Sequence, residues 1–281
     1  MGPGPDSRAQ ISSVTLCIWL AFPAAQGKES NHVEISQCRV LVTGGGSGLG
    51  AVLARDFAAA GARVHICGRR EAPLAAISAD HDRISSHILD VTDEAATAAL
   101  FAAIGPQQIV IANAGIAESA PLHKTDSDMW HRIIAVNLTG CFLTLREGLR
   151  ALREDRADWG RLIAISSIMG LDGYRYASAY SASKHGVNGM VSATAAELDG
   201  SGITANALCP GYLEGEMTDR SVTRITGKTG KSRQEAEAIL AATSPAGRLI
   251  RPEEVSAEAL RLCGPGSGSI NGQAISINGE A

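Results

Sequence analysis

The feature that most constrains the fold is a glycine-rich segment, T-G-G-G-S-G-L-G at residues 43–50. The apolar run before it, residues 39–42, is typical of a strand, and residues 48–60 have the pattern of a helix that ends at Gly61. Glycines at such a turn let the backbone approach a pyrophosphate, whose charge is stabilised at a helix N-terminus. The alternative is a tight turn that needs glycine only for packing. The segment therefore predicts a dinucleotide site at the start of a βαβ series.

Strand and helix patterns keep alternating along the rest of the chain. Further strands are expected at residues 63–67, 84–89, 108–112, 161–166, 204–208 and 274–277. Helices are expected at residues 71–79, from an N-cap at Thr92 through residue 104, at 126–153 and at 180–198. This alternation indicates a parallel sheet covered on both faces. We predict an α/β protein: a single-domain Rossmann fold over residues 38–281, with a doubly wound parallel sheet of about seven strands and helices on both faces.

Residues 1–37 do not continue this pattern. Their apolar run, residues 11–25, has the length of a signal peptide and follows Arg8, but it is too short for a stable membrane span. One interpretation is an export or anchoring segment. The favoured one is a loosely ordered extension, for example from a translation start placed too far upstream. We therefore expect an N-terminal extension at residues 1–37 and a cytoplasmic protein.

Charge and cysteine usage exclude several classes of partner. The chain has 25 Lys and Arg residues against 29 Asp and Glu residues, a formal net charge of -4, which argues against a nucleic-acid partner. No C-x-x-C pair occurs, so we expect no metal site. The six cysteines are expected to be small buried residues of a protein from a reducing compartment; they are Cys17, Cys38, Cys67, Cys141, Cys209 and Cys263.

The spacing T-G-x-x-x-G-x-G resembles that of the short-chain dehydrogenase/reductase family. Two later motifs extend the resemblance: Leu89-Asp90-Val91, similar to the family's adenine-contacting turn, and A-N-A-G at residues 112–115, similar to its N-A-G turn. The family's usual first Asn of that turn is Ala112 here. The resemblance implies a nicotinamide dinucleotide held by Gly44, Ser47, Gly48, Leu49, Gly50, Arg69, Asp90, Val91, Asn113, Gly115, Tyr180, Lys184, Pro210, Gly211 and Leu213.

The end of the second expected strand indicates which dinucleotide is bound. NAD enzymes place an acid there for the ribose 2′-hydroxyl, whereas this chain has C-G-R-R at residues 67–70. A guanidinium at Arg69 suits a 2′-phosphate by its charge and by its fork geometry. The alternative is a solvated arginine pair. Ser47 stands where many NADP-using relatives carry a basic residue. We predict NADP as the preferred cofactor and NAD as the alternative.

Four residues form the expected catalytic group. Tyr180 and Lys184 are four apart on one helix face, Ser167 follows a strand 13 residues before Tyr180, and Asn137 lies in the long upstream helix. Alone, Ser167 and Asn137 could be ordinary polar residues. A Lys184 ammonium, together with the positive oxidised nicotinamide, is expected to lower the phenol pKa of Tyr180. The resemblance implies that Tyr180 protonates a carbonyl oxygen, Ser167 bonds that oxygen, Lys184 also holds the ribose, and Asn137 positions a relay water.

One departure from the family lies after the turn at Pro210-Gly211. The family usually places Thr five residues after this Pro, where this chain has Gly215. The contact that the hydroxyl of this family threonine makes to the cofactor is expected to be missing here, or to come from Thr218.

The substrate side is expected over residues 217–245, which show helical periodicity. Its basic residues are Arg220, Arg224, Lys228, Lys231 and Arg233, with no acid from 220 to 233. One hypothesis is that this patch binds the phosphopantetheine of coenzyme A or an acyl carrier protein, and the other is a solvated helix face. The layout is similar to 3-oxoacyl reductases and polyketide ketoreductases.

These features predict an oxidoreductase that interconverts a ketone and a secondary alcohol, foremost a 3-oxoacyl thioester reductase. One alternative is an NAD-linked dehydrogenase of a small secondary alcohol or a 3-hydroxyacyl substrate. A second alternative, from another class, is a non-catalytic nucleotide-binding sensor. The expected partner is a small carbonyl substrate, and the expected assembly is a homotetramer or homodimer.

Overall fold

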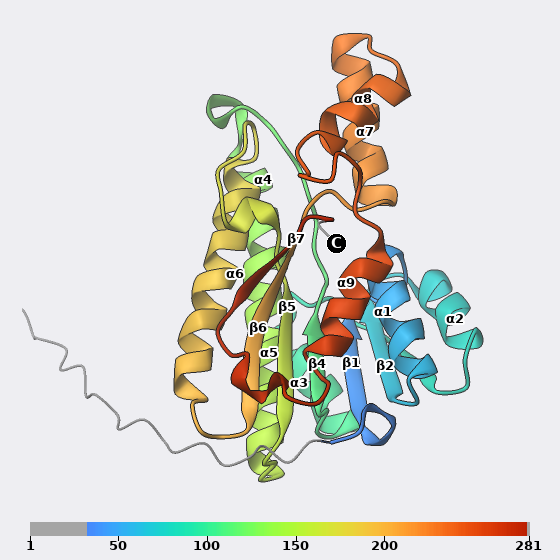
Figure 1. Cartoon of the computed structure of the whole chain (residues 1–281), viewed down its shortest axis with the longest axis vertical. Coiled ribbons are helices and arrows are strands. Elements are labelled where there is room, and N and C mark those ends of the chain that lie inside the picture. Colours follow the sequence, from blue (N-terminus) through green and yellow to red (C-terminus); the bar gives the residue numbers. More distant parts are fainter. Residues whose placement is uncertain (1–32, 280–281) are drawn as a thin grey trace, which may run out of the picture.

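The computed structural model describes residues 33–279, and its centre is one seven-stranded parallel sheet (Figure 1). The strand order is β3-β2-β1-β4-β5-β6-β7. The predicted α/β Rossmann architecture is thereby confirmed. The strands are β1 (Arg39–Thr43), β2 (Arg63–Gly68), β3 (Ile84–Ile88), β4 (Ile109–Ala112), β5 (Gly160–Ile165), β6 (Ile203–Pro210) and β7 (Ala274–Ile277).

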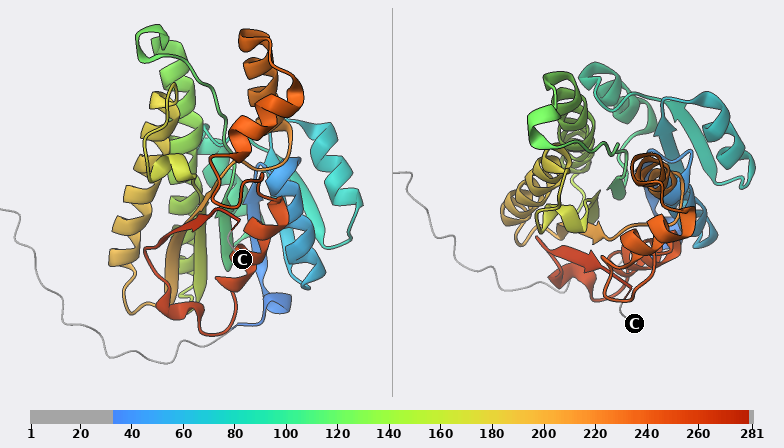
Figure 2. Two further views of the ribbon diagram at one scale, coloured as in Figure 1. Left: turned by 45° about the horizontal axis from the view of Figure 1, so that its top comes forward. Right: turned by 90° about the horizontal axis from the view of Figure 1, so that it is seen from above.

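Helices cover both faces of the sheet, as Figure 2 shows. They are α1 (Gly48–Ala59), α2 (Glu71–Ala79), α3 (Glu94–Ile104), α4 (Ser127–Ile134), α5 (Gly140–Glu154), α6 (Ser178–Glu197), α7 (Glu216–Thr229), α8 (Arg233–Ala241) and α9 (Pro252–Arg261). On one face α1 packs against α9, and their side chains share a buried core with Val40 and Val42 of β1. On the other face α3, α5 and α6 share a second core with Leu41 of β1 and Leu162 of β5.

The strand order reverses direction at β1. From β1 the chain adds β2 and β3 on one side, and then crosses back to place β4 on the other side. In open parallel sheets a crevice forms at the carboxyl ends of the strands where the order reverses, and ligands bind there. The glycine-rich loop follows β1, Asn113 follows β4, and Ser167 follows β5. The topology therefore brings the predicted motifs to one edge of the sheet, called the carboxyl edge below.

The prediction of a single helix over residues 126–153 is wrong in one respect. A π-helical segment, Ala135–Thr139, separates α4 from α5. Within it, the Asn137 side chain bonds the backbone of Ile116 twice: the Ile116 N–H donates to Oδ1 at 2.8 Å, and Nδ2 donates to the Ile116 carbonyl at 2.9 Å. Single π turns inside α-helices are rare and concentrate at functional sites. Here the wider turn holds the Asn137 amide against the loop after β4.

The expected N-cap of α3 at Thr92 is also wrong by one residue. The cap is Asp93, whose carboxylate accepts a hydrogen bond from the Ala96 N–H at 2.9 Å. Thr92 does not cap the helix, because its N–H and its hydroxyl both donate to Oδ1 of Asp90, at 3.0 and 2.8 Å. An aspartate–threonine turn thus replaces the expected cap and fixes the Asp90 carboxylate.

The packed part of the chain starts before the expected boundary at Cys38. Residues Ile35–Gln37 form a short 3-10 helix, and Val33 and Ile35 pack against the core shared by α1 and α9. The apolar run at residues 11–25 and Cys17 lie outside the described residues. The five cysteines of the described part are buried free thiols. Among the described helices, none combines the length and apolarity that a membrane crossing needs.

Residues 217–245, predicted to be helical, form most of α7 and all of α8. The two helices stand beyond the carboxyl edge, at the top of Figure 1. They are joined by a small apolar cluster of Val222, Ala236 and Leu240, against which Tyr212 packs from the segment after β6. A capping box at Ser232 and Glu235 starts α8. This helical pair is attached to the sheet next to the end of β6.

Candidate active site

The glycine-rich loop is packed tightly on one side and open on the other. A Cβ added at Gly50 would lie 2.2 Å from the Gly44 carbonyl oxygen, and one at Gly45 would lie 2.5 Å from the Ile66 side chain. A Cβ at Gly48, by contrast, would meet no described atom within 4 Å. Gly44 and Gly48 also have positive φ angles of 68° and 52°, which favour glycine. This open cradle at the start of α1 fits a pyrophosphate group.

Thr43 and Asn113 hold the loop in place. The Thr43 hydroxyl oxygen accepts the backbone N–H groups of Asn113 and Ala114, each at 3.0 Å. In return, Asn113 Nδ2 donates to the Thr43 carbonyl at 2.8 Å. Thr43 is fully buried. The turn after β4 and the loop after β1 therefore form one rigid unit.

Two arginines lie at the end of β2, and only Arg69 was predicted to bind cofactor. Nη2 of Arg70 lies 3.5 Å from the Ser47 hydroxyl in the glycine-rich loop. The pKa of Asp90 is lowered mainly by the hydrogen bond from the Thr92 N–H, and the charge of nearby Arg69 lowers it further. Ser47 thus has a basic neighbour from β2 in place of the basic residue missing from the loop. The dipeptide R-R was the only sequence signal for Arg70.

Asn137, Lys184 and Gly115 meet at the carboxyl edge of the sheet. Asn137 and Lys184 are almost fully buried, at 1% and 4% exposure. Lys184 Nζ donates to the Ile165 carbonyl at the end of β5 at 2.8 Å, and Asn137 Nδ2 donates to the Ser183 hydroxyl at 3.2 Å. A Cβ at Gly115 would lie 3.4 Å from Asn137 Oδ1 and 3.8 Å from Lys184 Nζ. These contacts join the elements after β4 and β5 to α6.

Tyr180 lies next to this group on α6, in the first turn of the helix. Its ring centroid is 5.7 Å from Lys184 Nζ. Burial raises the pKa of Tyr180 to about 12, and the nearby Ser167 hydroxyl opposes that rise. Burial also lowers the pKa of Lys184 to about 8. Burial has the largest effect on the phenol pKa, and the phenol is neutral at pH 7. The lowering expected from Lys184 together with an oxidised nicotinamide stays a prediction.

The segment after β6 explains the departure at Gly215. The Gly211 N–H donates to the Ile277 carbonyl at 3.0 Å, and Leu213 forms a parallel bridge with Ile250. Gly215 then adopts φ 130°, a conformation that side-chain-bearing residues rarely accept. A threonine at this position would be strained, whatever its contact to a cofactor. Thr218, the expected substitute, lies buried in the first turn of α7.

The basic patch predicted on α7 and α8 is largely neutralised. Arg220 pairs with Glu216 at 3.2 Å, and Arg233 pairs with Asp219 and with Glu237. These acids lie just outside residues 220–233, which is why the sequence stretch looked purely basic. Arg224 differs: Nη1 donates to the Ser119 hydroxyl at 2.8 Å, and no carboxylate within residues 33–279 pairs with it. The expected patch is thus reduced mainly to one half-buried guanidinium and two exposed lysines, Lys228 and Lys231.

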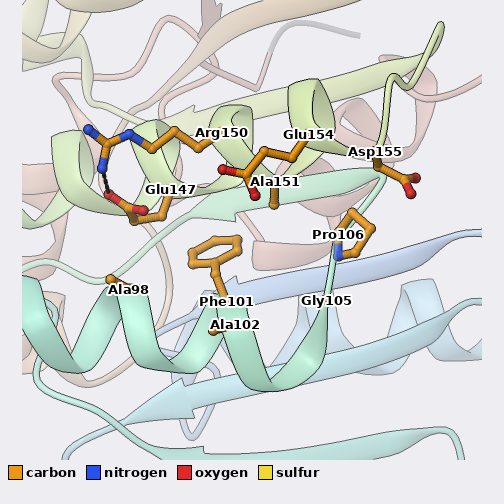
Figure 3. Close-up of a pocket in the computed structure, with 10 residues that line it drawn as sticks. All are labelled: Ala98, Phe101, Ala102, Gly105, Pro106, Glu147, Arg150, Ala151, Glu154 and Asp155. Carbon is orange, nitrogen blue, oxygen red and sulfur yellow. Dashed lines mark hydrogen bonds and ion pairs between the residues drawn. The ribbon is translucent and has the colours of Figure 1, made fainter.

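A separate hollow of about 560 Å³ lies between α3 and α5 (Figure 3). Ala98, Phe101 and Ala102 of α3 line one wall, and Glu147 and Arg150, joined by an ion pair of 2.9 Å, line the other. None of the predicted site residues lines it. The predicted residues gather instead at the carboxyl edge.

Three comparisons place the chain among known proteins. The family model described as short chain dehydrogenase matches residues 39–225. The cis-4-hydroxycyclohexanecarboxylate dehydrogenase of Sinomonas cyclohexanicum is 36% identical, over 85% of this chain and 94% of that protein. The 3-oxoacyl-(acyl-carrier-protein) reductase of Rickettsia bellii is 29% identical, over 88% and 98%. A crystal structure of an actinorhodin polyketide ketoreductase variant with NADPH superimposes with a TM-score of 0.81 at 32% identity, over 87% of this chain and 97% of that one.

Proposed function

This chain belongs to the short-chain dehydrogenase family and is an NAD(P)-dependent oxidoreductase, and from that premise we propose that it reduces a 3-oxoacyl thioester with NADPH. The observation that carries the proposal is the placement of the Tyr180 phenol beside the Ser167 hydroxyl, with the buried ammonium of Lys184 5.7 Å from the Tyr180 ring centroid. A proton donor and a second hydrogen-bonding hydroxyl, close together in a buried crevice, are what reduction of a carbonyl oxygen requires.

The four predicted catalytic residues have distinct tasks in this proposal. The bound nicotinamide supplies the hydride that the carbonyl carbon accepts. Tyr180 donates its phenolic proton to the carbonyl oxygen, and its raised pKa keeps that proton in place at neutral pH. Ser167 donates a hydrogen bond to the same oxygen. Lys184 is mostly protonated below a pH of about 8 and returns a proton toward Tyr180, while Asn137 positions the water that resupplies Lys184.

The cofactor preference rests on Arg69 and Arg70. Both guanidiniums lie at the end of β2, where an NAD enzyme would carry an acid, and Arg70 reaches Ser47 of the phosphate loop. The NADPH in the actinorhodin ketoreductase structure supports the same choice. The test compares kcat/KM for NADPH and NADH in the wild type, Arg69→Asp and Arg70→Gln. In both variants kcat/KM should fall at least tenfold with NADPH and change little with NADH.

Arg63→Gln is the matched control for the cofactor test. It removes an exposed arginine at the opposite end of the same strand, away from the loop, and should change neither cofactor's kcat/KM. Equal losses with NADPH and NADH in the Arg69 and Arg70 variants would contradict a 2′-phosphate site. A wild-type preference for NADH would favour the NAD-linked alternative.

The relatives support two substrate classes. The 3-oxoacyl-(acyl-carrier-protein) reductase and the polyketide ketoreductase favour a 3-oxoacyl thioester. The cis-4-hydroxycyclohexanecarboxylate dehydrogenase favours a secondary alcohol on a carboxylic acid, and this is the second candidate. The deciding measurement is a substrate panel followed by NADPH absorbance: 3-oxoacyl thioesters, the matching free 3-oxo acids and simple cyclic ketones.

The panel has three informative outcomes. A thioester preference supports the proposal, and a preference for the acids or ketones supports the second candidate. The absence of turnover with every member, in a protein that binds the cofactor, would support the nucleotide-binding sensor. The cytoplasmic location, the carrier-protein partner and the homotetramer or homodimer stay predictions, and sedimentation of the purified chain tests the last of these.

A further inference from the structure

Arg224 is the arginine of α7 whose charge no acid balances in the part of the chain that the structure describes. Arg220, one turn earlier on the helix, and Arg233 on α8 both have carboxylate partners. Arg224 is half-buried, and within residues 33–279 its one hydrogen-bond partner is the neutral hydroxyl of Ser119. A guanidinium has five N–H donors, and a single hydroxyl oxygen satisfies only one or two of them. Partial burial of an unbalanced charge is unfavourable unless an anion completes the site.

The position of this contact ties it to the catalytic crevice. Ser119 lies in the loop after β4, and the next residue, Ala120, donates its N–H to the carbonyl of Tyr176, four residues before Tyr180. Gly115, four residues before Ser119, borders Lys184. Four residues span at most about 14 Å of chain, so the Arg224–Ser119 contact lies within reach of an extended substrate whose carbonyl is at Tyr180.

Arg224 and Ser119 come from segments on opposite sides of the carboxyl edge. Figure 2 shows α7 and α8 on one side of the carboxyl edge and the segment that leads to α4 on the other. The contact of 2.8 Å joins these two segments. Ser119 accepts a hydrogen bond from Arg224, which leaves its own hydroxyl proton free to donate. Glu118, the acid beside it, is paired with Arg132 at 3.2 Å and so repels an incoming anion less.

We propose that Arg224 and Ser119 form an anion-binding clamp that recognises a carboxylate or phosphate at the far end of the substrate. The guanidinium would donate two N–H groups to the anion and Ser119 would donate its hydroxyl, the arrangement in which arginine binds such groups most strongly. The inference rests on the proposed carbonyl reduction, because it assigns a second recognition point for the same substrate. It makes Arg224 a specificity-determining residue.

The test uses two pairs of substrates that share a carbonyl and differ in charge. The first pair is acetoacetyl-coenzyme A and the neutral acetoacetyl-N-acetylcysteamine, and the second is acetoacetate and its methyl ester. With Arg224→Gln, kcat/KM should fall about 10- to 100-fold for the anionic member of one pair and stay within twofold for its neutral member. A lower kcat/KM for acetoacetyl-coenzyme A identifies phosphate as the group that Arg224 binds. A lower kcat/KM for acetoacetate identifies carboxylate.

Two further variants and one control sharpen the result. Arg224→Lys should recover part of the loss, and Ser119→Ala should show a smaller loss in the same pair. Arg220→Gln removes a guanidinium one turn away that Glu216 already neutralises, and it should keep the wild-type preference. The clamp is overturned if Arg224→Gln affects charged and neutral members equally, or affects neither.

A binding measurement separates this proposal from the proposed function. The wild type and Arg224→Gln are each loaded with NADP and titrated in a calorimeter. The ligands form two pairs that differ in charge: 4′-phosphopantetheine and pantetheine, and acetoacetate and methyl acetoacetate. Weaker binding of an anionic ligand alone in the variant supports the clamp even if no carbonyl is turned over. If carbonyls are reduced but neither anion binds more weakly in the variant, the clamp is wrong and the proposed function stands.

Discussion

The side-chain ammonium of Lys184 donates a hydrogen bond to the carbonyl oxygen of Ile165 over 2.8 Å. This bond joins the first turns of α6 to the end of β5 and holds the ammonium in the interior, at 4% exposure. Burial disfavours the charged form, so the pKa of Lys184 falls to about 8. The site therefore contains a cation that can release its proton in weakly alkaline solution.

The first prediction concerns the pH dependence of carbonyl reduction. Because Lys184 loses its proton as the pH rises through about 8, kcat/KM at saturating NADPH should be level near pH 7 and fall above pH 8. Lys184→Arg keeps its charge throughout this range, so whatever its rate, the fall near pH 8 should disappear. An unchanged alkaline limb in this variant would show that another group titrates.

The second prediction concerns the phenol of Tyr180. Tyr180→Phe keeps the ring and removes the acidic proton, so kcat should fall about 100- to 10,000-fold while the dissociation constant of NADPH stays within twofold. Ser167→Ala should lower kcat by less, because Tyr180 remains. Tyr176→Phe is the control: its side chain is 61% exposed, and the variant should keep wild-type turnover. Wild-type rates in Tyr180→Phe would exclude the mechanism.

The third prediction concerns the stability of the phosphate loop without cofactor. Thr43→Val leaves the buried N–H groups of Asn113 and Ala114 without their shared acceptor, so the free energy of unfolding should fall by about 2–4 kcal/mol. Thr43→Ser keeps the acceptor and loses one buried methyl group, which costs about 1 kcal/mol. Urea unfolding measures the free energy of unfolding of both variants. Equal losses in Thr43→Val and Thr43→Ser would show that packing matters here more than the hydroxyl.

The fourth prediction concerns acid stability at the start of α9. Both oxygens of Glu254 accept from Arg248, at 2.7 and 2.8 Å, and this is the main cause that lowers the pKa of Glu254 to about 2. A carboxyl with a lowered pKa stabilises the fold above its ordinary value of 4.5, and that contribution is lost as the pH falls through about 2.

Glu254→Gln should therefore lower the unfolding free energy at pH 7 by about 1 kcal/mol, a modest value because Arg248 is partly exposed. The difference from the wild type should shrink steadily between pH 4.5 and pH 2. Glu253→Gln, next to it and exposed, should show a smaller effect with no such trend. A difference between wild type and Glu254→Gln that is constant with pH would contradict the assignment.

Local patterns were enough to predict the sheet and the motifs at its carboxyl edge. The loop at residues 43–50 lies between β1 and α1 because strand periodicity, glycine and helix propensity all agree there. Chain order and the reversal beside β1 then brought Asn137, Ser167, Tyr180 and Lys184 to one edge.

What could not be predicted depends on contacts between distant segments. Arg70 reaches Ser47 across 23 residues of sequence, and Arg224 reaches Ser119 across 105. Neither distance carries a periodic signal, so the sequence supported only the neighbouring Arg69 and an undivided basic patch. Burial of the Tyr180 phenol, which raises its pKa to about 12, likewise depends on contacts between distant segments.

The π-helical segment at residues 135–139 determines what the deletion of one residue would do at this point of the chain. A π turn holds one residue more than an α-helix needs over the same rise, so α4 and α5 could keep their packing if one residue were deleted there. The regular helix left behind would lack the wide turn that seats Asn137 against Ile116. A single deletion at this point should thus leave a folded protein without the proposed proton relay. The extra residue would then distinguish, in an alignment of related sequences, the chains that keep this turn from those that have lost it.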